Sequence, residues 1–289
     1  MAGPTPAELV RRSAAYLERH GVESPTANAE ALLMHVLGTD RTGLYARRDG
    51  LDMRAARLFG RALCRRCAGT PLQHVTGEQA FLDLTIAVRP GVFVPRPETE
   101  LVAVRALEVI EAVTRPVVVD VGTGTGAIAV TVAARRPDAE VLATDASPAA
   151  VRLARENARR LGARVDVRLG DLLAPLDPAH RGRVDLVVSN PPYLTEDEFR
   201  DLPPEVRLEP YEALVGGTDV HARLAEDARD WLRPGGWLVL EIGETQGNEV
   251  RVLLVAAGFD RVSVGHDLGG RDRLVSGCLR PGRWSAGAS

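Results

Sequence analysis

Four consecutive residues carry the strongest chemical signal in the sequence: Asn190, Pro191, Pro192 and Tyr193, directly after the apolar segment 184–189. The asparagine offers a side-chain oxygen that accepts hydrogen bonds, and the two prolines stiffen the chain while leaving their carbonyls free as acceptors. Tyr193 adds a flat ring on which a planar group can lie. Together they suit an –NH2 group on a planar carbon, with two acceptors for its two hydrogens. A rigid polyproline turn beside a buried tyrosine is the structural alternative.

A glycine-rich segment is the second candidate site. It follows the apolar segment 117–121, in which Asp120 is the one charged residue, and it precedes a helical pattern. Closely spaced glycines let a ligand approach the backbone, and the N–H groups at a helix start face that ligand. The G-x-G-x-G spacing differs from the G-x-G-x-x-G of dinucleotide folds, and the carboxylate of Asp120 would repel a pyrophosphate but attract a cationic sulfonium amino acid. We therefore expect a cofactor loop, rather than only a tight turn, at Gly122, Thr123, Gly124, Thr125 and Gly126.

Two further acidic residues follow the next two predicted strands. Asp145 lies 25 residues after Asp120, close to the offset of about 20 residues at which a carboxylate binds ribose hydroxyls in α/β folds. The N-cap of the next helix is the alternative role for Asp145. Asp171 and Leu172 could hold and pack an adenine ring, although an aspartate after a strand is also typical of a simple turn.

These candidate sites depend on an alternating series of strands and helices that begins near residue 116. Short apolar runs alternate with segments of helical periodicity, which is the pattern of a mostly parallel sheet covered by helices on both faces. The last two strands follow each other without a helix, which predicts an antiparallel edge strand in this α/β fold. The predicted strands are 117–121, 140–144, 164–168, 184–189, 237–242, 262–266 and 273–278, and the predicted helices are 128–135, 148–161, 220–232 and 249–257.

The first 97 residues differ from the rest of the chain. Helical periodicity and a capping box at Thr5 and Glu8 predict a small helical domain at residues 1–75. Residues 1–75 carry a net charge of +4, whereas residues 76–289 carry −7. The positive charge of the helical domain would suit an acidic partner surface. Alternating residues at 82–88 and a return strand at 92–94 predict a β-hairpin linker at 76–97, which leaves 98–289 as the sheet domain.

Several motifs together resemble one family, the protein-(glutamine-N5) methyltransferases that modify peptide chain release factors, within the class I S-adenosylmethionine-dependent methyltransferases. The resemblance spans nearly the whole chain. The Asn-Pro-Pro-Tyr motif is shared with adenine-N6 DNA methyltransferases, whereas the stretch Pro-Arg-Pro-Glu-Thr-Glu is more specific to the glutamine family. The segments that carry the resemblance are 71–73, 77–78, Phe81, 95–100, 122–126, 190–193, 209–210 and 213–215.

The resemblance implies a Rossmann-like methyltransferase domain that transfers a methyl group from S-adenosylmethionine to the glutamine side chain in the Gly-Gly-Gln loop of release factors. The helical domain 1–75 would hold the release factor. The side-chain oxygen of Asn190 and the carbonyl of Pro191 would accept the two amide hydrogens. The implied cofactor-binding residues are Gly122, Thr123, Gly124, Thr125, Gly126, Asp145, Asp171, Leu172 and Asn190, and the implied substrate-binding residues are Asn190, Pro191, Pro192 and Tyr193.

Three alternative functions stay open on the sequence alone. A sister enzyme that methylates a glutamine of a ribosomal protein shares these motifs. An adenine-N6 methyltransferase shares the site chemistry, but the net charge of −3 and the lack of an evident basic recognition segment disfavour it. A cofactor-free module that binds the translation machinery is the non-enzymatic alternative. Within the stretch 95–100, Arg96, Glu98 and Thr99 are expected either to order a cofactor lid or substrate loop or to form a salt-bridged linker.

Composition narrows the class of protein. With 45% hydrophobic and 26% charged residues, the chain matches ordinary globular proteins. No apolar run approaches the ~18 residues of a membrane span, and charged residues stand where an export signal needs an apolar core, so we expect a cytoplasmic protein. The pair Cys64 and Cys67 lacks the further ligands that a zinc site requires, so we expect no metal. We also expect a monomer that does not bind nucleic acid directly.

Overall fold

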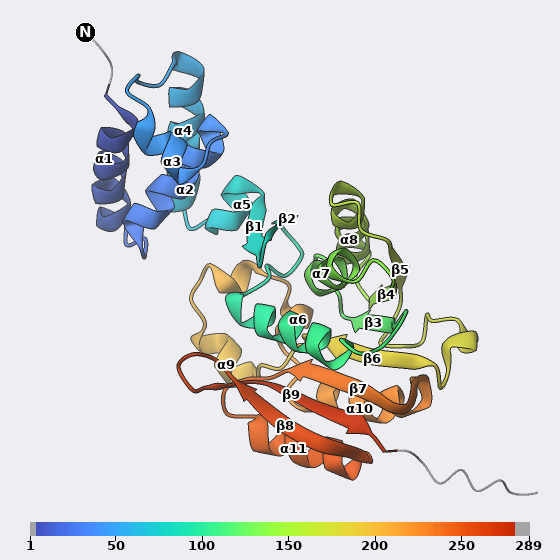
Figure 1. Cartoon of the computed structure of the whole chain (residues 1–289). Coiled ribbons are helices and arrows are strands. Elements are labelled where there is room, and N and C mark those ends of the chain that lie inside the picture. Colours follow the sequence, from blue (N-terminus) through green and yellow to red (C-terminus); the bar gives the residue numbers. More distant parts are fainter. Residues whose placement is uncertain (1–3, 281–289) are drawn as a thin grey trace, which may run out of the picture. The chain divides into compact units, whose positions relative to one another are not determined.

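A computed structural model describes residues 4–280 of the chain (Figure 1). The chain divides into two compact units. The first runs to Glu78 and also contains Pro203–Leu208, and the second contains Gln79–Leu202 and the chain from Glu209 onward. Within the described residues, no helix combines the length and the apolar character that crossing a membrane requires. The outer ends of the predicted domains, residues 1–3 and 281–289, lie outside the described residues.

The first unit is helical, as the sequence predicted. Thr5 and Glu8 form the predicted capping box, in which the Glu8 N–H donates to Thr5 Oγ1 at 3.4 Å and the Thr5 N–H donates to the Glu8 carboxylate at 2.8 Å. Buried leucines and Phe59 belong to a hydrophobic core within this unit. Its elements are α1 (Pro6–Arg19), α2 (Pro25–Leu37), α3 (Arg41–Ala46), α4 (Met53–Cys67), α5 (Leu72–Thr76) and the short turn η2 (Val206–Leu208).

A buried arginine fixes the segment Pro203–Leu208 within the first unit. Arg66 is 7% exposed, its Nε donates to Asn28 Oδ1 at 2.7 Å, and its Nη1 lies 2.8 Å from the Glu205 carboxylate. A guanidinium buried this deeply is stable only when its charge is paired. The pairing with Glu205 therefore makes this distant segment part of the unit's packing.

The β-hairpin differs from the prediction in the position of its strands. β1 (Glu78–Phe81) pairs with β2 (Leu84–Ala87), so the turn consists of Leu82 and Asp83. Leu82 has φ +52°, and its N–H donates to the Glu100 carboxylate at 2.9 Å, which holds this turn. The predicted return strand 92–94 is wrong, because its first residue packs into a small apolar cluster instead of pairing with a strand.

A seven-stranded sheet forms the centre of the second unit, in the order β5-β4-β3-β6-β7-β9-β8. Strands β3 to β7 pair in parallel, and β9 runs antiparallel to both of its neighbours. The predicted, mostly parallel sheet is therefore confirmed, with its antiparallel strand next to the edge strand β8. The strands are β3 (Val117–Val121), β4 (Glu140–Asp145), β5 (Val165–Leu169), β6 (Val184–Ser189), β7 (Leu232–Glu241), β8 (Phe259–His266) and β9 (Asp272–Leu279).

Helices cover both faces of this sheet. Neighbouring residues of β3 show the two sides, because Val118 packs in a cluster with α6, α7 and α8, whereas Val119 packs in a cluster with α10 and α11. Helix α6 was not predicted, and β7 begins at Leu232 rather than at residue 237. The helices of this unit are α6 (Pro97–Val109), α7 (Ala127–Arg135), α8 (Pro148–Arg160), α9 (Glu196–Asp201), α10 (Asp219–Trp231) and α11 (Gly247–Ala256), with short turns η1 (Pro178–His180) and η3 (Tyr211–Ala213).

Candidate active site

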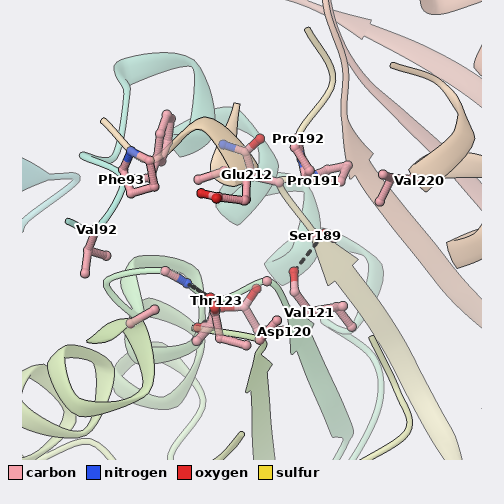
Figure 2. A pocket seen from close by; sticks show the side chains of 18 of the residues that line it. Val92, Phe93, Asp120, Val121, Thr123, Ser189, Pro191, Pro192, Glu212 and Val220 are labelled. Atoms are coloured by element: carbon pink, nitrogen blue, oxygen red, sulfur yellow. Dashed lines mark hydrogen bonds between the residues drawn. The ribbon is translucent and has the colours of Figure 1, made fainter. Parts of the chain in front are cut away.

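A cavity of about 450 Å³ lies at the carboxyl ends of the parallel strands, within the second unit. Residues that follow β3, β4, β5 and β6 line it, together with the segments 91–95 and 210–215. Figure 2 shows Phe93 and Glu212 on one side and Asp120 and Thr123 on the other. The volume falls within the range of about 300–1,000 Å³ that small-molecule sites occupy.

The glycine-rich segment enters the cavity for most of its length. Gly122 and Gly124 have φ of +67° and +57°, conformations that a residue with a Cβ adopts at a cost. The segment Gly122–Thr125 lines the cavity, but Gly126 does not. A Cβ on Gly126 would lie 3.1 Å from the Cβ of Ala154, so this glycine allows α7 to pack closely against α8.

Asp120 presents an unsatisfied carboxyl oxygen beside the cavity. Its Oδ2 accepts hydrogen bonds from Thr123 Oγ1 at 2.6 Å and from the Ala129 N–H at 3.1 Å. Its Oδ1 is buried and has no hydrogen-bond partner among residues 4–280. Burial raises the pKa of Asp120 to about 7. A cationic group in the cavity would favour the ionised form of this carboxylate.

Asp145 joins the glycine-rich segment to the start of α8. Its Oδ2 accepts from the Gly124 N–H at 2.8 Å, and its Oδ1 accepts from the Ser147 N–H at 2.8 Å. The N-cap of α8 is Ser147, so the alternative role predicted for Asp145 belongs to the residue two positions later. Asp145 lines the cavity, and each carboxylate oxygen keeps a further lone pair for a ligand hydroxyl. Burial raises the pKa of this group as well.

Asp171 and Leu172 also line the cavity, after β5. The Asp171 carboxylate pairs with the guanidinium of Arg223 at 2.7 Å, and Arg223 lines the cavity too. Leu172 has φ +44°, an uncommon conformation that turns the chain at this point. Both residues therefore lie on the cavity wall after β5, with an ion pair that the sequence did not indicate.

The loop after β6 holds Asn190, Pro191 and Pro192 on the cavity wall. Nδ2 of Asn190 donates to Thr99 Oγ1 at 3.1 Å, which leaves Oδ1 as the acceptor end of the amide. Ser189 precedes the loop and donates from its Oγ to the Val121 carbonyl at 2.7 Å, the dashed line at the Ser189 label in Figure 2. The loop is thereby attached to the end of β3, next to the glycine-rich segment.

Tyr193 is not among the residues that line the cavity. Its hydroxyl donates to Glu241 Oε1 at 3.5 Å, and its carbonyl accepts from Gln246 Nε2 at 2.8 Å. Burial raises the pKa of the phenol. Tyr193 thus supports the loop from outside the cavity, whereas the aromatic ring of Phe93 lines it.

The segments 91–95 and 210–215 were not predicted as parts of the site. An ion pair joins them, since the Arg96 guanidinium contacts the carboxylate of Glu209, which also accepts from the Val94 N–H at 3.3 Å. Burial raises the pKa of Glu209, and the charge of Arg96 opposes that rise. The Arg96 guanidinium lies 5.2 Å from the centroid of the Phe93 ring. The motif at 95–100 was the available signal, but nothing in its spacing indicates that it meets Glu209.

The chain is similar to known proteins along both units. Residues 8–77 match the family model of the PrmC N-terminal domain, and residues 83–202 match that of the methyltransferase small domain. A release factor glutamine methyltransferase of Moorella thermoacetica is 45% identical over 274 residues, covering 92% of this chain and 94% of the relative. Another, of Cereibacter sphaeroides, is 44% identical over 280 residues, covering 94% and 98%.

The fold has a counterpart among solved structures. The T. thermophilus 16S rRNA N2 G1207 methyltransferase (RsmC) aligns with a TM-score of 0.53 at 22% identity, over 70% of this chain and 50% of that one. This likeness supports the Rossmann-like methyltransferase fold. The sequence identity to the relatives extends over nearly the full length of both proteins. The chain therefore belongs to the family of release factor glutamine methyltransferases.

Proposed function

We propose that this protein transfers a methyl group from S-adenosylmethionine to the side-chain amide nitrogen of the glutamine in the Gly-Gly-Gln loop of peptide chain release factors. The observation that carries the proposal is the oriented amide of Asn190, a residue that lines the cavity: its Nδ2 donates to Thr99 Oγ1 at 3.1 Å, which leaves Oδ1 as the acceptor end. The names of the relatives, at 45% and 44% identity, support the choice of substrate.

The carboxylates and backbone groups around the cavity fit S-adenosylmethionine. The Asp120 carboxylate, whose buried Oδ1 has no hydrogen-bond partner among residues 4–280, suits a positively charged amino acid portion nearby. Asp145 has acceptor capacity left for the ribose hydroxyls, and we assign the adenine to Asp171 and Leu172. The segment Gly122–Thr125 lines the cavity and would lie against the ligand. When bound, the cofactor supplies a methyl group on a positively charged sulfur, which is a good electrophile.

The loop after β6 binds the amide group of the substrate glutamine, whose nitrogen is a weak nucleophile. An amide nitrogen reacts poorly because its lone pair is delocalised into the carbonyl. Asn190 Oδ1 and the Pro191 carbonyl accept its two hydrogens, which favours the positive charge that develops on nitrogen. Each hydrogen bond contributes about 0.5–1.5 kcal/mol net, whereas orientation of reacting groups can supply ~7–11 kcal/mol. Positioning is therefore the larger contribution, and the acidic methylated amide loses its proton without a dedicated base.

We assign recognition of the release factor to residues 1–75, the linker to 76–97 and the reaction to 98–289. The net charge of +4 on the first 75 residues suits an acidic protein surface. We further propose that the enzyme acts as a monomer in the cytoplasm. The overall net charge of −3 supports a protein substrate in place of direct nucleic-acid binding, which usually requires a large positive excess.

Mass spectrometry of a release factor incubated with enzyme and S-adenosylmethionine tests this proposal. We expect one added methyl group on the Gly-Gly-Gln peptide, and none when that glutamine is replaced by alanine. Ribosomal proteins and bare nucleic acid in parallel reactions are the controls for substrate choice. Methylation of either in place of the release factor would overturn the substrate, and calorimetry that shows no cofactor binding would overturn the enzymatic function.

A further inference from the structure

The two ends of the Asn190 amide have nearly the same shape and opposite hydrogen-bonding character. Only the Oδ1 end can accept a hydrogen from a substrate amide, and a half-turn of the side chain would present N–H donors instead. The role proposed for Asn190 therefore requires a partner that distinguishes the two ends. The group at hydrogen-bonding distance from Nδ2 is the hydroxyl of Thr99, at 3.1 Å.

Thr99 lies in the first turn of α6, where its position is fixed. It is 4% exposed, and its N–H donates to the Arg96 carbonyl at 3.1 Å. A hydroxyl can both donate and accept, so it selects Nδ2 over Oδ1 only if its own hydrogen points elsewhere. The acidic group next to it is Glu241 at the end of β7, whose pKa the Thr99 hydroxyl lowers.

Glu241 is a buried acceptor with capacity to spare. It is 1% exposed, and its Oε2 has no hydrogen-bond partner within 3.5 Å among residues 4–280. Within residues 4–280, the hydrogen bond to its Oε1 is the long one of 3.5 Å from Tyr193. An ionised carboxylate can accept but not donate. Glu241 therefore directs the hydroxyl hydrogens of Thr99 and Tyr193 toward itself.

We propose that Thr99 and Glu241 are positioning residues for the methyl transfer. The ionised Glu241 carboxylate takes the Thr99 hydrogen, so the Thr99 oxygen accepts from Asn190 Nδ2 and Asn190 Oδ1 is held toward the substrate. This inference rests on the proposed function of Asn190. No covalent bond changes in the chain of contacts, which acts only by selecting one of two orientations of an amide.

Protonation of Glu241 would weaken this selection. A neutral carboxyl can itself donate, which frees the Thr99 hydrogen to point at Asn190 Oδ1 and favours the rotated amide. Burial raises the pKa of Glu241 to about 7, and the charge of Glu98 acts in the same direction. The Thr99 hydroxyl, Tyr193 and Arg273 oppose the rise. His221 contacts the main chain of Glu241 through a bond of 2.9 Å from Nε2 to the carbonyl, and burial lowers its pKa.

Two substitutions at Thr99 separate the hydroxyl from the shape of the side chain. Thr99→Val keeps the shape and loses the hydroxyl, whereas Thr99→Ser keeps the hydroxyl. The matched control is Thr131→Val in α7, a fully buried threonine outside the cavity whose hydroxyl bonds to the Ala127 carbonyl at 2.8 Å. We expect Thr99→Val to lower kcat about tenfold and Thr99→Ser to stay within about threefold, the scale of one well-placed hydrogen bond. The cofactor Kd of the Thr99 variants and the kcat of Thr131→Val should stay at the wild-type values.

The pH profile and an NMR measurement complete the test. Wild-type kcat should rise with pH through about 7 as the carboxylate forms, and Glu241→Gln should lack this rise. In the cofactor-free enzyme labelled with nitrogen-15, the side-chain NH2 of Asn190, assigned by its loss in Asn190→Ala, should exchange slowly in the wild type and in Thr99→Ser. It should exchange rapidly in Thr99→Val. Glu241→Gln serves as the second variant if Thr99→Val does not fold.

Three outcomes would overturn the positioning role: weaker cofactor binding in Thr99→Val, equal losses of kcat in Thr99→Val and Thr99→Ser, or an unchanged exchange rate of the Asn190 amide. Weaker cofactor binding would mean that Thr99 contacts the cofactor, and equal losses would mean that it only fills space. A wild-type enzyme that leaves release factors unmethylated would instead overturn the proposed function. The exchange measurement does not depend on activity, so the two failures can be told apart.

Discussion

The packing of Gly126 against α8 leads us to expect a large loss of stability in Gly126→Ala. Gly126 has φ +84°, and a Cβ there would lie 3.1 Å from the Cβ and 3.2 Å from the Cα of Ala154, inside the separation of about 3.5–4.0 Å at which carbon atoms attract. The left-handed backbone costs about 1–2 kcal/mol for a residue with a Cβ. Extra volume in a packed interior costs about 1–3 kcal/mol. Together these are about 2–5 kcal/mol, a large share of the roughly 5–15 kcal/mol that stabilises a domain.

Gly162→Ala is the matched control, because Gly162 has φ +64° and open space around its Cβ position. Only the backbone cost of about 1–2 kcal/mol applies there. Urea unfolding can be followed by tryptophan fluorescence, since Trp231 and Trp237 lie in the second unit and the first unit has no tryptophan. We expect the midpoint of Gly126→Ala to lie well below that of Gly162→Ala at equal slope. Equal midpoints would refute the steric reasoning.

The site residues lead to three further predictions. Asn190→Ala should lower kcat about 10²–10³-fold with cofactor Kd by calorimetry within a few fold, and unchanged turnover would contradict its role. Asp145→Ala should raise cofactor Kd about tenfold or more, since a hydrogen bond to a charged group contributes about 1.5–3 kcal/mol; an unchanged Kd would leave it a purely structural bridge. Because burial raises the pKa of Asp120 to about 7, the free energy of unfolding of the cofactor-free protein should fall as pH rises from about 4 to about 7. Urea titrations across this range should show a flatter fall in Asp120→Asn, and an identical slope would argue against the burial effect.

The sheet and much of the site were predictable because their signals are local. Strands β3 and β6 are short, largely apolar runs, and the G-x-G-x-G turn needs positive φ at Gly122 and Gly124, which the residue type itself indicates. Parallel strands end at one edge of a sheet, so strand prediction alone brings Asp145 and Asn190 toward a common cavity. These inferences required no knowledge of side-chain packing.

The remaining features depend on contacts between residues far apart in the chain. Thr99 meets Asn190 across 91 positions, and Arg96 meets Glu209 across 113. The role of Gly126 is set by its spatial neighbour, so the spacing of glycines cannot distinguish a packing glycine from a cofactor glycine. Helix α6 was missed because its apolar residues form no single stripe, with Val104 exposed among buried neighbours.

The segment Pro203–Leu208 belongs to the first unit although it lies far along the chain. This limits where the chain can be cut to isolate the helical unit. A fragment that ends at Glu78 would keep Arg66 and lose Glu205. Its guanidinium would remain sequestered without a counter-charge, and removing one partner of a buried ion pair costs up to about 3–5 kcal/mol. An autonomous helical fragment would therefore need the later hexapeptide supplied in trans or grafted after its own terminus.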